Sequence, residues 1–238
     1  MASKFKFLLP LFCVVMLLVP ALPVPEFWIT QLNYIGLYSI VSLGLVLLTG
    51  VAGLTSFGQA AFVGVGAYTS AYLSTALGIS PWLALFVGLG LAVVVALLLG
   101  ALTLRMSGHY LPLATICWGL ALNYTMANME WLGKYDGILG IPMLSLFGIG
   151  LGAGRGLPPL VWALALLAAL ACLRLLDSRP GRAIRALKSG STMAEAMGIS
   201  TFRYKLTVFV MAAMLAAVSG WLFAHFQRSV SPSPFGIN

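Results

Sequence analysis

The longest charge-free stretch of this sequence constrains its fold more than any other feature. Between Phe27 and Leu104 there is no Asp, Glu, Lys or Arg. Over the whole chain only 8% of residues are charged and the mean hydropathy is +1.03, whereas soluble domains carry about 25% charged residues. Because so few charges cannot cover a water-facing surface, the chain is expected to lie in a lipid bilayer. Helices satisfy their own backbone hydrogen bonds there, which predicts an all-α protein.

Apolar runs of suitable length predict about seven spans. A helix needs about 20 apolar residues to cross the hydrocarbon core. The longest run therefore holds about three helices, separated by "TGVAGLTSFGQ" (49–59) and "GISPW" (78–82). We predict a polytopic transmembrane helix bundle forming a single domain over 1–238, with spans near 7–23, 31–49, 60–78, 82–104, 110–129, 158–173 and 206–225.

The positions of the basic residues predict an orientation. Lys and Arg favour cytoplasmic loops of membrane proteins. With Lys4 and Lys6 inside, the alternation of seven spans puts all 13 basic residues on the cytoplasmic side except Lys134, Arg155 and Arg228. We therefore expect a cytoplasmic N-terminus. The first apolar segment also has the features of a signal peptide, so its cleavage stays open as an alternative.

The sequence lacks the motifs of several function classes. Basic residues that flank the predicted spans explain the formal net charge of +8. The sequence has no basic face interleaved with aromatic residues, which is the pattern that would indicate nucleic-acid binding. There is no GxxxxGK[ST] phosphate loop, no HExxH and no CxxC, and the three cysteines lack metal-ligand spacing. We expect no catalytic residue, metal site or cofactor in this chain, so an energy source would have to lie on a partner.

One polar, basic island interrupts the apolar pattern. The stretch "GRAIRALKSGSTMAEAMGIS" (181–200) lies between the last two predicted spans. Pro180 suits a first helical turn, and the pattern that follows predicts a short amphipathic helix. "TMAE" predicts a capping box with Thr192 as the cap and Glu195 reaching back, and Gly198 predicts the end of that second helix. Two short helices at a glycine corner are suited to docking against another protein.

This island resembles a known loop. "AEAMGIS" resembles the EAA-type loop of bacterial ABC importer permeases. The segments "LTGVAGLTSFGQAAFVGVGAYTSAYL", "LTLRMSGHYLPLATICWG", "DGILGIP" and "RPGRAIRALKSGSTMAEAMGISTFRYKLTVFVMAAMLAAVSGWLFAH" occur in the same order as in LivM-type permeases of branched-chain amino acid importers. The resemblance covers nearly the whole chain from about residue 30.

The resemblance implies an inner-membrane permease subunit without enzymatic activity. Its implied partners are ABC ATPase subunits that bind the ATP, a sister LivH-type permease and a periplasmic substrate-binding protein. The loop near 174–205 would be the cytoplasmic ATPase-docking loop, with the coupling role carried by Gly181, Arg182, Arg185, Glu195, Ala196 and Gly198.

The solute pathway is predicted from a break in the helix pattern. A break exposes backbone N–H and C=O groups at membrane depth, where they can bind a zwitterion. "GLTSFGQ" is the candidate break, which makes Thr55, Ser56, Gly58, Gln59 and the more distant Asn123 candidate pathway residues; a simple turn at this place is the alternative.

Three other functions stay open at the level of sequence. The chain could be a self-contained channel or facilitator, an ABC permease for another small solute such as an amide, urea or a sugar, or a truncated inactive remnant. The last alternative arises because family members usually continue beyond the segment that corresponds to the end of this chain at Asn238. A facilitator has no need of an ATPase-docking corner, so the island at 181–200 favours the importer.

Overall fold

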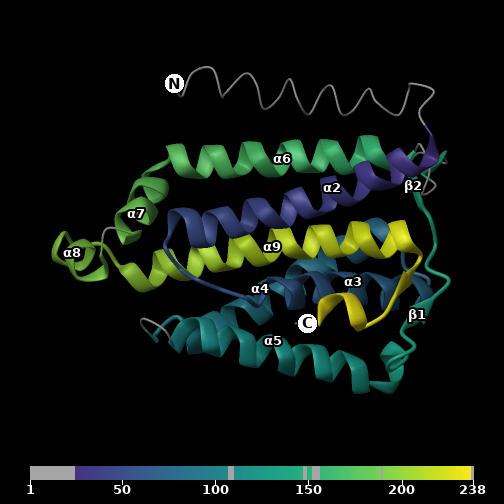
Figure 1. Ribbon diagram of the computed structural model, residues 1–238, viewed down its shortest axis with the longest axis horizontal. Coiled ribbons are helices and arrows are strands. Elements are labelled where there is room, and N and C mark those ends of the chain that lie inside the picture. The colour runs from purple at the N-terminus through teal and green to yellow at the C-terminus, as the bar shows by residue number, and fades with distance from the viewer. Residues whose placement is uncertain (1–24, 107–109, 147–148, 152–155, 189, 237–238) are drawn as a thin grey trace.

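The computed structural model describes residues 25–106, 110–146, 149–151, 156–188 and 190–236, and helices dominate it (Figure 1). The predicted span at 7–23 lies outside these residues. The remaining predicted spans correspond to long helices, and their bounds are α2 (Glu26–Leu45) with its continuation as a π-helix η2 (Val46–Val51), α3 (Gln59–Thr75), α4 (Pro81–Thr103), α5 (Tyr110–Asn128), α6 (Leu157–Asp177) and α9 (Thr201–Gln227).

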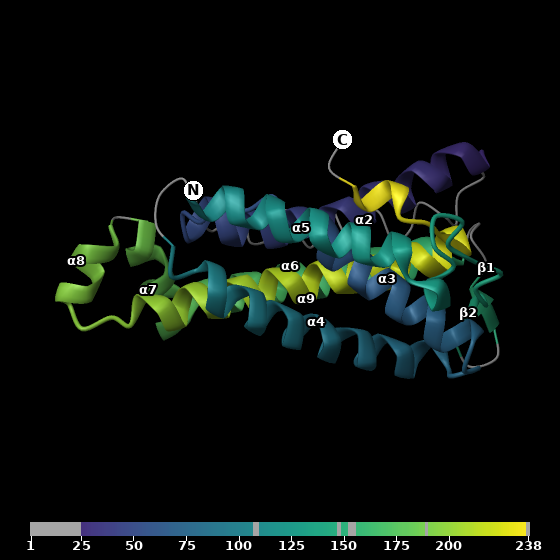
Figure 2. The same ribbon diagram turned by 90° about the horizontal axis from the view of Figure 1, so that it is seen from below.

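Short elements gather at the two ends of the bundle. The island forms α7 (Arg179–Lys188) and α8 (Ser191–Ala196) at one end. At the opposite end β1 (Ile138–Leu139) pairs antiparallel with β4 (Ser229–Val230), and β2 (Leu144–Leu146) pairs with β3 (Ile149–Leu151). Single 3-10 turns, η3 (Glu130–Leu132) and η4 (Ser233–Phe235), flank these strands. Both views show the two ends far apart along the bundle (Figures 1 and 2).

The helices of the described part match a membrane protein in length and composition. Four are long and apolar enough to cross a bilayer: Glu26–Val51, Pro81–Thr103, Leu157–Asp177 and Thr201–Gln227. Large apolar side chains are exposed along α4, among them Phe86 at 68% and Leu98 at 62%. Soluble proteins rarely expose such a continuous apolar face, so this surface is suited to lipid.

Helix α3 begins within one residue of the predicted span 60–78 but ends earlier, at Thr75. It has 17 residues, fewer than the roughly 20 that a crossing needs. The chain leaves η2 at the α7–α8 end and runs as coil toward the middle of the bundle, where α3 starts (Figure 1). The predicted break near residues 49–59 therefore contains irregular backbone at residues 52–58, which follows the candidate span Glu26–Val51 and precedes the shorter helix α3.

Helices α3 and α9 approach each other at backbone distance. A Cβ at Gly220 would overlap the carbonyl oxygen of Val63, and a Cβ at Gly66 would overlap that of Ala217. In lipid there is no hydrophobic drive to bring helices together, and small residues stabilise packing by letting backbones approach closely. These two glycines set the distance between the two helices.

Hydrogen bonds of the His225 side chain hold the β-strand end of α9 against its neighbours. His225 is buried, and its Nδ1 lies 2.9 Å from the Pro142 carbonyl oxygen while its Nε2 lies 2.9 Å from Ser70 Oγ. Because a carbonyl only accepts, Nδ1 is the protonated nitrogen, and in the neutral ring Ser70 donates to Nε2. One imidazole thus links α9, α3 and the segment that follows β1.

Replacing Gly220 with alanine is expected to destabilise the bundle. The added methyl group would overlap the Val63 carbonyl, and overpacking of this kind costs about 1–3 kcal/mol of unfolding free energy. Thermal unfolding of the purified protein in detergent, followed by size-exclusion fluorescence, should show a lower midpoint. Gly90→Ala is the matched control, because nothing lies within 4 Å of that position, and its midpoint should be unchanged or higher. Equal midpoints for the two variants would contradict the proposed role of Gly220.

Candidate functional site: a docking corner and a cavity

The first candidate region is the helix α7 at one end of the bundle. Its apolar face is buried, with Ile184 at 0% and Leu187 at 6% exposure, while Arg182 and Arg185 are exposed. This confirms the amphipathic helix predicted from the sequence. Ser178 Oγ accepts from the Gly181 N–H at 3.3 Å, which is the geometry of an N-cap. Pro180 therefore lies in the first turn of the helix, as the sequence predicts.

Two of the candidate coupling residues hold α7 against the end of α6. Gly181 is buried, and a Cβ there would overlap the carbonyl oxygens of Leu175 and Leu176. The Arg185 guanidinium donates to the Leu176 carbonyl. A basic side chain at this place satisfies a carbonyl that has no partner within its own helix. Gly181 and Arg185 thus fix the angle at which α7 leaves the bundle.

Helix α8 begins and ends on glycine. Gly190 (φ 134°) occupies the N-cap position without a side-chain cap, and its carbonyl accepts from the Ala194 N–H at 3.1 Å. The predicted capping box is wrong, because the helix starts at Ser191 and Thr192 lies inside it. The predicted end is confirmed. Gly198 (φ 76°) donates to the Glu195 carbonyl at 2.9 Å and Ile199 donates to the Ala194 carbonyl at 3.1 Å, a Schellman motif.

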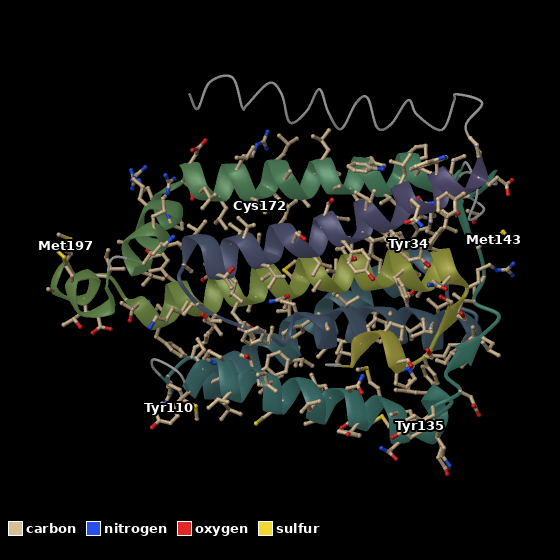
Figure 3. The ribbon with its side chains drawn as sticks, in the orientation of Figure 1. Tyr34, Tyr110, Tyr135, Met143, Cys172 and Met197 are labelled. Carbon is tan, nitrogen blue, oxygen red and sulfur yellow. The ribbon has the colours of Figure 1, made fainter. Side chains whose placement is uncertain are left out.

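The outer surface of α8 is mixed in character. Glu195 does not reach back along α8; its Oε1 accepts from Thr201 Oγ1 at 2.6 Å, which ties the helix to the start of α9. Met193 and Met197 are 62% and 70% exposed, and Ala196 and Gly198 are exposed beside them. Figure 3 shows Met197 at the tip of the molecule, pointing away from the bundle. We call the exposed face formed by Met193, Ala196, Met197 and Gly198 the α8 tip.

Sequence reasoning missed the link between this corner and the rest of the bundle. Lys188 Nζ donates to the Gly50 carbonyl in η2 at 2.9 Å. Gly53 (φ 71°) lies beside it, where a Cβ would make an ordinary van der Waals contact with the Lys188 Cα at 3.6 Å. The two partners are 138 residues apart in sequence, so no local pattern could have revealed the contact.

The second candidate region is the irregular segment that follows η2. The Ala52 and Leu54 N–H groups still donate backward, to the Leu47 and Leu48 carbonyls, and further on the Phe57 N–H donates to Thr115 Oγ1 of α5 at 3.2 Å. Irregular backbone at membrane depth is tolerated only where it is buried in protein or lines a cavity. This segment does line a cavity.

The cavity has a volume of about 510 Å³ and lies between α2, α3, α9 and η4. No charged side chain is among its lining residues, which are Tyr34, Leu37, Tyr38, Val41, Leu45, Thr49, Thr55, Ser56, Phe57, Gln59, Ala60, Val63, Ser219, Phe223, Pro234 and Phe235. At one edge Tyr34 accepts from Gln227 Nε2 at 2.7 Å, and Figure 3 shows this tyrosine between α2 and α9. The volume is in the range of small-molecule sites.

The candidate pathway residues divide into two groups. Thr55, Ser56 and Gln59 line the cavity together. Gly58 lies behind them, where a Cβ would overlap the Trp118 ring. Asn123 lies outside the cavity lining and donates to the Pro232 carbonyl at 3.0 Å, which holds the turn preceding η4.

Two of the cavity residues keep buried polar atoms without partners. Ser56 is 6% and Gln59 is 4% exposed, and neither the Ser56 hydroxyl nor the Gln59 amide has a hydrogen-bond partner within the described residues. Unpaired buried polar groups cost about 1–3 kcal/mol each.

Within the described part of the chain, no three His, Cys, Asp or Glu side chains are grouped to hold a metal ion.

Comparison with known proteins places the chain in a family. The model of the branched-chain amino acid transport system permease component family matches residues 28–238. The chain belongs to this permease family. The match covers the described helices from residue 28 onward, and together with the apolar helices it identifies a multi-pass membrane permease.

Curated relatives of this permease come from enteric bacteria. It is 32% identical over 223 residues to the high-affinity branched-chain amino acid transport system permease protein LivM of Escherichia coli (strain K12), and equally similar to the LivM protein of Salmonella typhimurium (strain LT2). Each match covers 84% of this chain and 52% of the relative, so the chain spans about half the length of these relatives. No solved structure matches it.

Replacing Gly181 with alanine should weaken the packing of α7 against the end of α6. The added methyl group would overlap the carbonyls that end α6, so α7 would have to move away and lose the Arg185 and Lys188 hydrogen bonds. Trypsin cleavage after the basic residues of α7, followed by mass spectrometry on the protein in detergent, should become roughly tenfold faster, which corresponds to about 1.4 kcal/mol.

The control for this variant is Gly150→Ala at the opposite end, where nothing lies within 4 Å. An unchanged cleavage rate in Gly181→Ala would show that α7 does not depend on this close contact.

Proposed function

We propose that this chain is a membrane permease subunit of an ATP-driven (ABC) importer for branched-chain or related amino acids. The observation that carries the proposal is the family match over residues 28–238, and the similarity to two LivM proteins supports the solute class. The chain would act in the bacterial inner membrane beside a sister LivH-type permease and receive its solute from a periplasmic binding protein.

ATP hydrolysis is assigned to separate ABC ATPase subunits, because this chain has no phosphate-binding loop of its own. The exposed α8 tip is the surface proposed to enter the ATPase, and the 174–205 loop around it is the coupling loop. Exposed methionines suit such a contact, since they are flexible and polarisable. In this arrangement Gly181 and Arg185 set the direction of α7, while Glu195 and Gly198 set the shape of the tip.

The proposed topology has about seven spans in a single permease domain with a cytoplasmic N-terminus. The α7–α8 end then faces the cytoplasm and the β-strand end faces the periplasm. The basic residues support this orientation: Arg105, Arg174, Arg182, Arg185, Lys188 and Lys205 belong to segments at the α7–α8 end.

The cavity is proposed as part of the solute pathway. Thr55, Ser56 and Gln59 would contact the solute there. Gly58 would support the wall by packing against Trp118, and Asn123 would support it by holding Pro232, which precedes η4. The absence of charged lining residues favours a solute without net charge, such as a zwitterionic amino acid, over a cation or a dicarboxylate.

A charge on the α8 tip is expected to prevent ATPase docking. Met197→Glu would bury a carboxylate against the ATPase, and co-purification of the ATPase with the membrane-extracted complex should fall by at least about tenfold. Met143→Glu is the matched control, because Met143 is 45% exposed at the opposite end (Figure 3). Equal ATPase recovery with both variants would exclude the α8 tip as the docking surface.

Uptake of radiolabelled leucine tests the function itself. Cells that lack their own permease of this type should regain ATP-dependent uptake when they express this chain, or this chain extended with the C-terminal part of the E. coli LivM protein, together with its transporter partners. Lys188→Met should reduce uptake several-fold, because it removes the hydrogen bond to Gly50 at the docking corner. Failure of both forms to restore uptake of leucine, isoleucine and valine would overturn the proposed function.

A further inference from the structure

An apolar groove lies against α3 at the β-strand end of the bundle, and its lining shares no residue with that of the cavity. The groove has a volume of about 240 Å³, and residues of α3, α4, α5 and η3 form its walls. Figure 2 shows α5 on one side of α3 and α4 on the other. We call this space, which separates α4 from α5, the α4–α5 groove.

The α4–α5 groove extends over the depth of one leaflet. Leu91 lies about ten residues into α4, and Val65 lies about ten residues before the end of α3. At 1.5 Å per residue, both are about 15 Å from the β-strand end, which is half the thickness of a hydrocarbon core of about 30 Å. Tyr72 and Trp131 line the opposite part of the groove, with ring centroids 6.4 Å apart. Tyrosine and tryptophan are enriched at the level of the lipid headgroups.

The walls of the groove favour an apolar occupant. No charged side chain is among its lining residues. The Thr69 hydroxyl already donates to the Val65 carbonyl at 2.7 Å, and the Tyr68 hydroxyl is buried, so neither is open to a polar ligand. A solute with several polar groups would lose its hydrogen bonds to water here without replacement, which is costly.

The α4–α5 groove is continuous with the surface that faces lipid. Leu91, at its edge, is 44% exposed and belongs to the same stripe of α4 as the exposed side chains of Val87, Val94 and Leu98. If the groove were empty, its walls would lose dispersion contacts. One turn of a helix, about 10 Å across and 5.4 Å high, occupies about 400 Å³. The groove is therefore too small for a helix of another protein, and its size suits a single extended chain.

We propose that one acyl chain of a phospholipid from the adjacent leaflet occupies the α4–α5 groove. Its headgroup lies at the level of Trp131, and the methyl end of its chain lies near Leu91 and Val65. The exposed ion pair between Lys134 and Glu130, at 2.9 Å, belongs to the same turn as Trp131 and suits the depth of the headgroups. The lipid thereby fills the space between α4 and α5, and this role goes beyond the transport of a solute.

Photolabelling of the permease complex in nanodiscs tests this assignment. The bilayer consists of phosphatidylethanolamine and phosphatidylglycerol, and a small fraction of the phosphatidylethanolamine carries a diazirine either near the ester or near the methyl end of one chain. Mass spectrometry then locates the labelled residues. The ester-end probe should label Tyr72 and Trp131, and the methyl-end probe should label Val65 and Leu91. Label on Met126 is the most informative, because this wall residue is only 6% exposed and lipid outside the groove does not reach it.

A tryptophan at the edge of the groove should exclude the chain. Leu91→Trp fills the groove from its exposed side, and labelling of Met126 should fall by at least about fivefold, because overpacking a filled space is unfavourable. Leu98→Trp is the matched control, since Leu98 lies on the same stripe of α4, is 62% exposed and is outside the groove lining. Its labelling of Met126 should equal that of the wild type. Leu91→Ala enlarges the groove and should keep the label.

Three results would overturn the proposal: no label on Met126 in the wild-type complex, equal labelling in the two tryptophan variants, or loss of the label in Leu91→Ala. If a partner subunit or a second copy of this chain covers the groove, Met126 stays unlabelled, and the lipid assignment is wrong. The labelling needs no transport, so its failure would leave the proposed importer function intact.

Discussion

Close backbone contact between α3 and α9 is the interaction on which the rest of this permease depends. Helix α9 packs against α2, α3 and α4, and its contact with α3 is possible only because Gly66 and Gly220 carry no Cβ. In lipid, helices associate through packing and hydrogen bonds and not through the hydrophobic effect. The glycine contact fixes the height and direction of α3, so it also fixes where α3 begins and therefore where the cavity lies.

Much of this architecture follows from short-range patterns. Apolar runs locate the helices because a bilayer requires internal backbone pairing, and Gly198 predicts the end of α8 because a left-handed residue closes a helix. The predicted capping box is wrong because the N-cap is Gly190, two residues before Thr192. The contacts from Lys188 to Gly50 and from Asn123 to Pro232 join residues more than 100 apart in sequence, and a sequence pattern cannot predict such contacts.

The candidate site shows the same division between local and long-range information. The sequence "GLTSFGQ" signals a break because glycine and hydroxyl residues interrupt an apolar run, and Thr55, Ser56 and Gln59 do line one cavity. The other walls come from α2, α9 and the turn near Phe235, which are distant in sequence. The break is stable at membrane depth because other parts of the chain pair with it, as Thr115 Oγ1 does with the Phe57 N–H.

The hydrogen bond between Lys188 and Gly50 connects α7, at one end of the bundle, to η2, which leads into the wall of the cavity. Gly50 belongs to the π-helix η2, whose chain continues directly into the segment that carries Ser56 and Gln59. A sideways displacement of α7 would therefore be transmitted to the wall of the cavity through the irregular backbone between Gly50 and Ser56. Force applied at one end of the bundle can change the shape of the interior without rotation of a whole transmembrane helix.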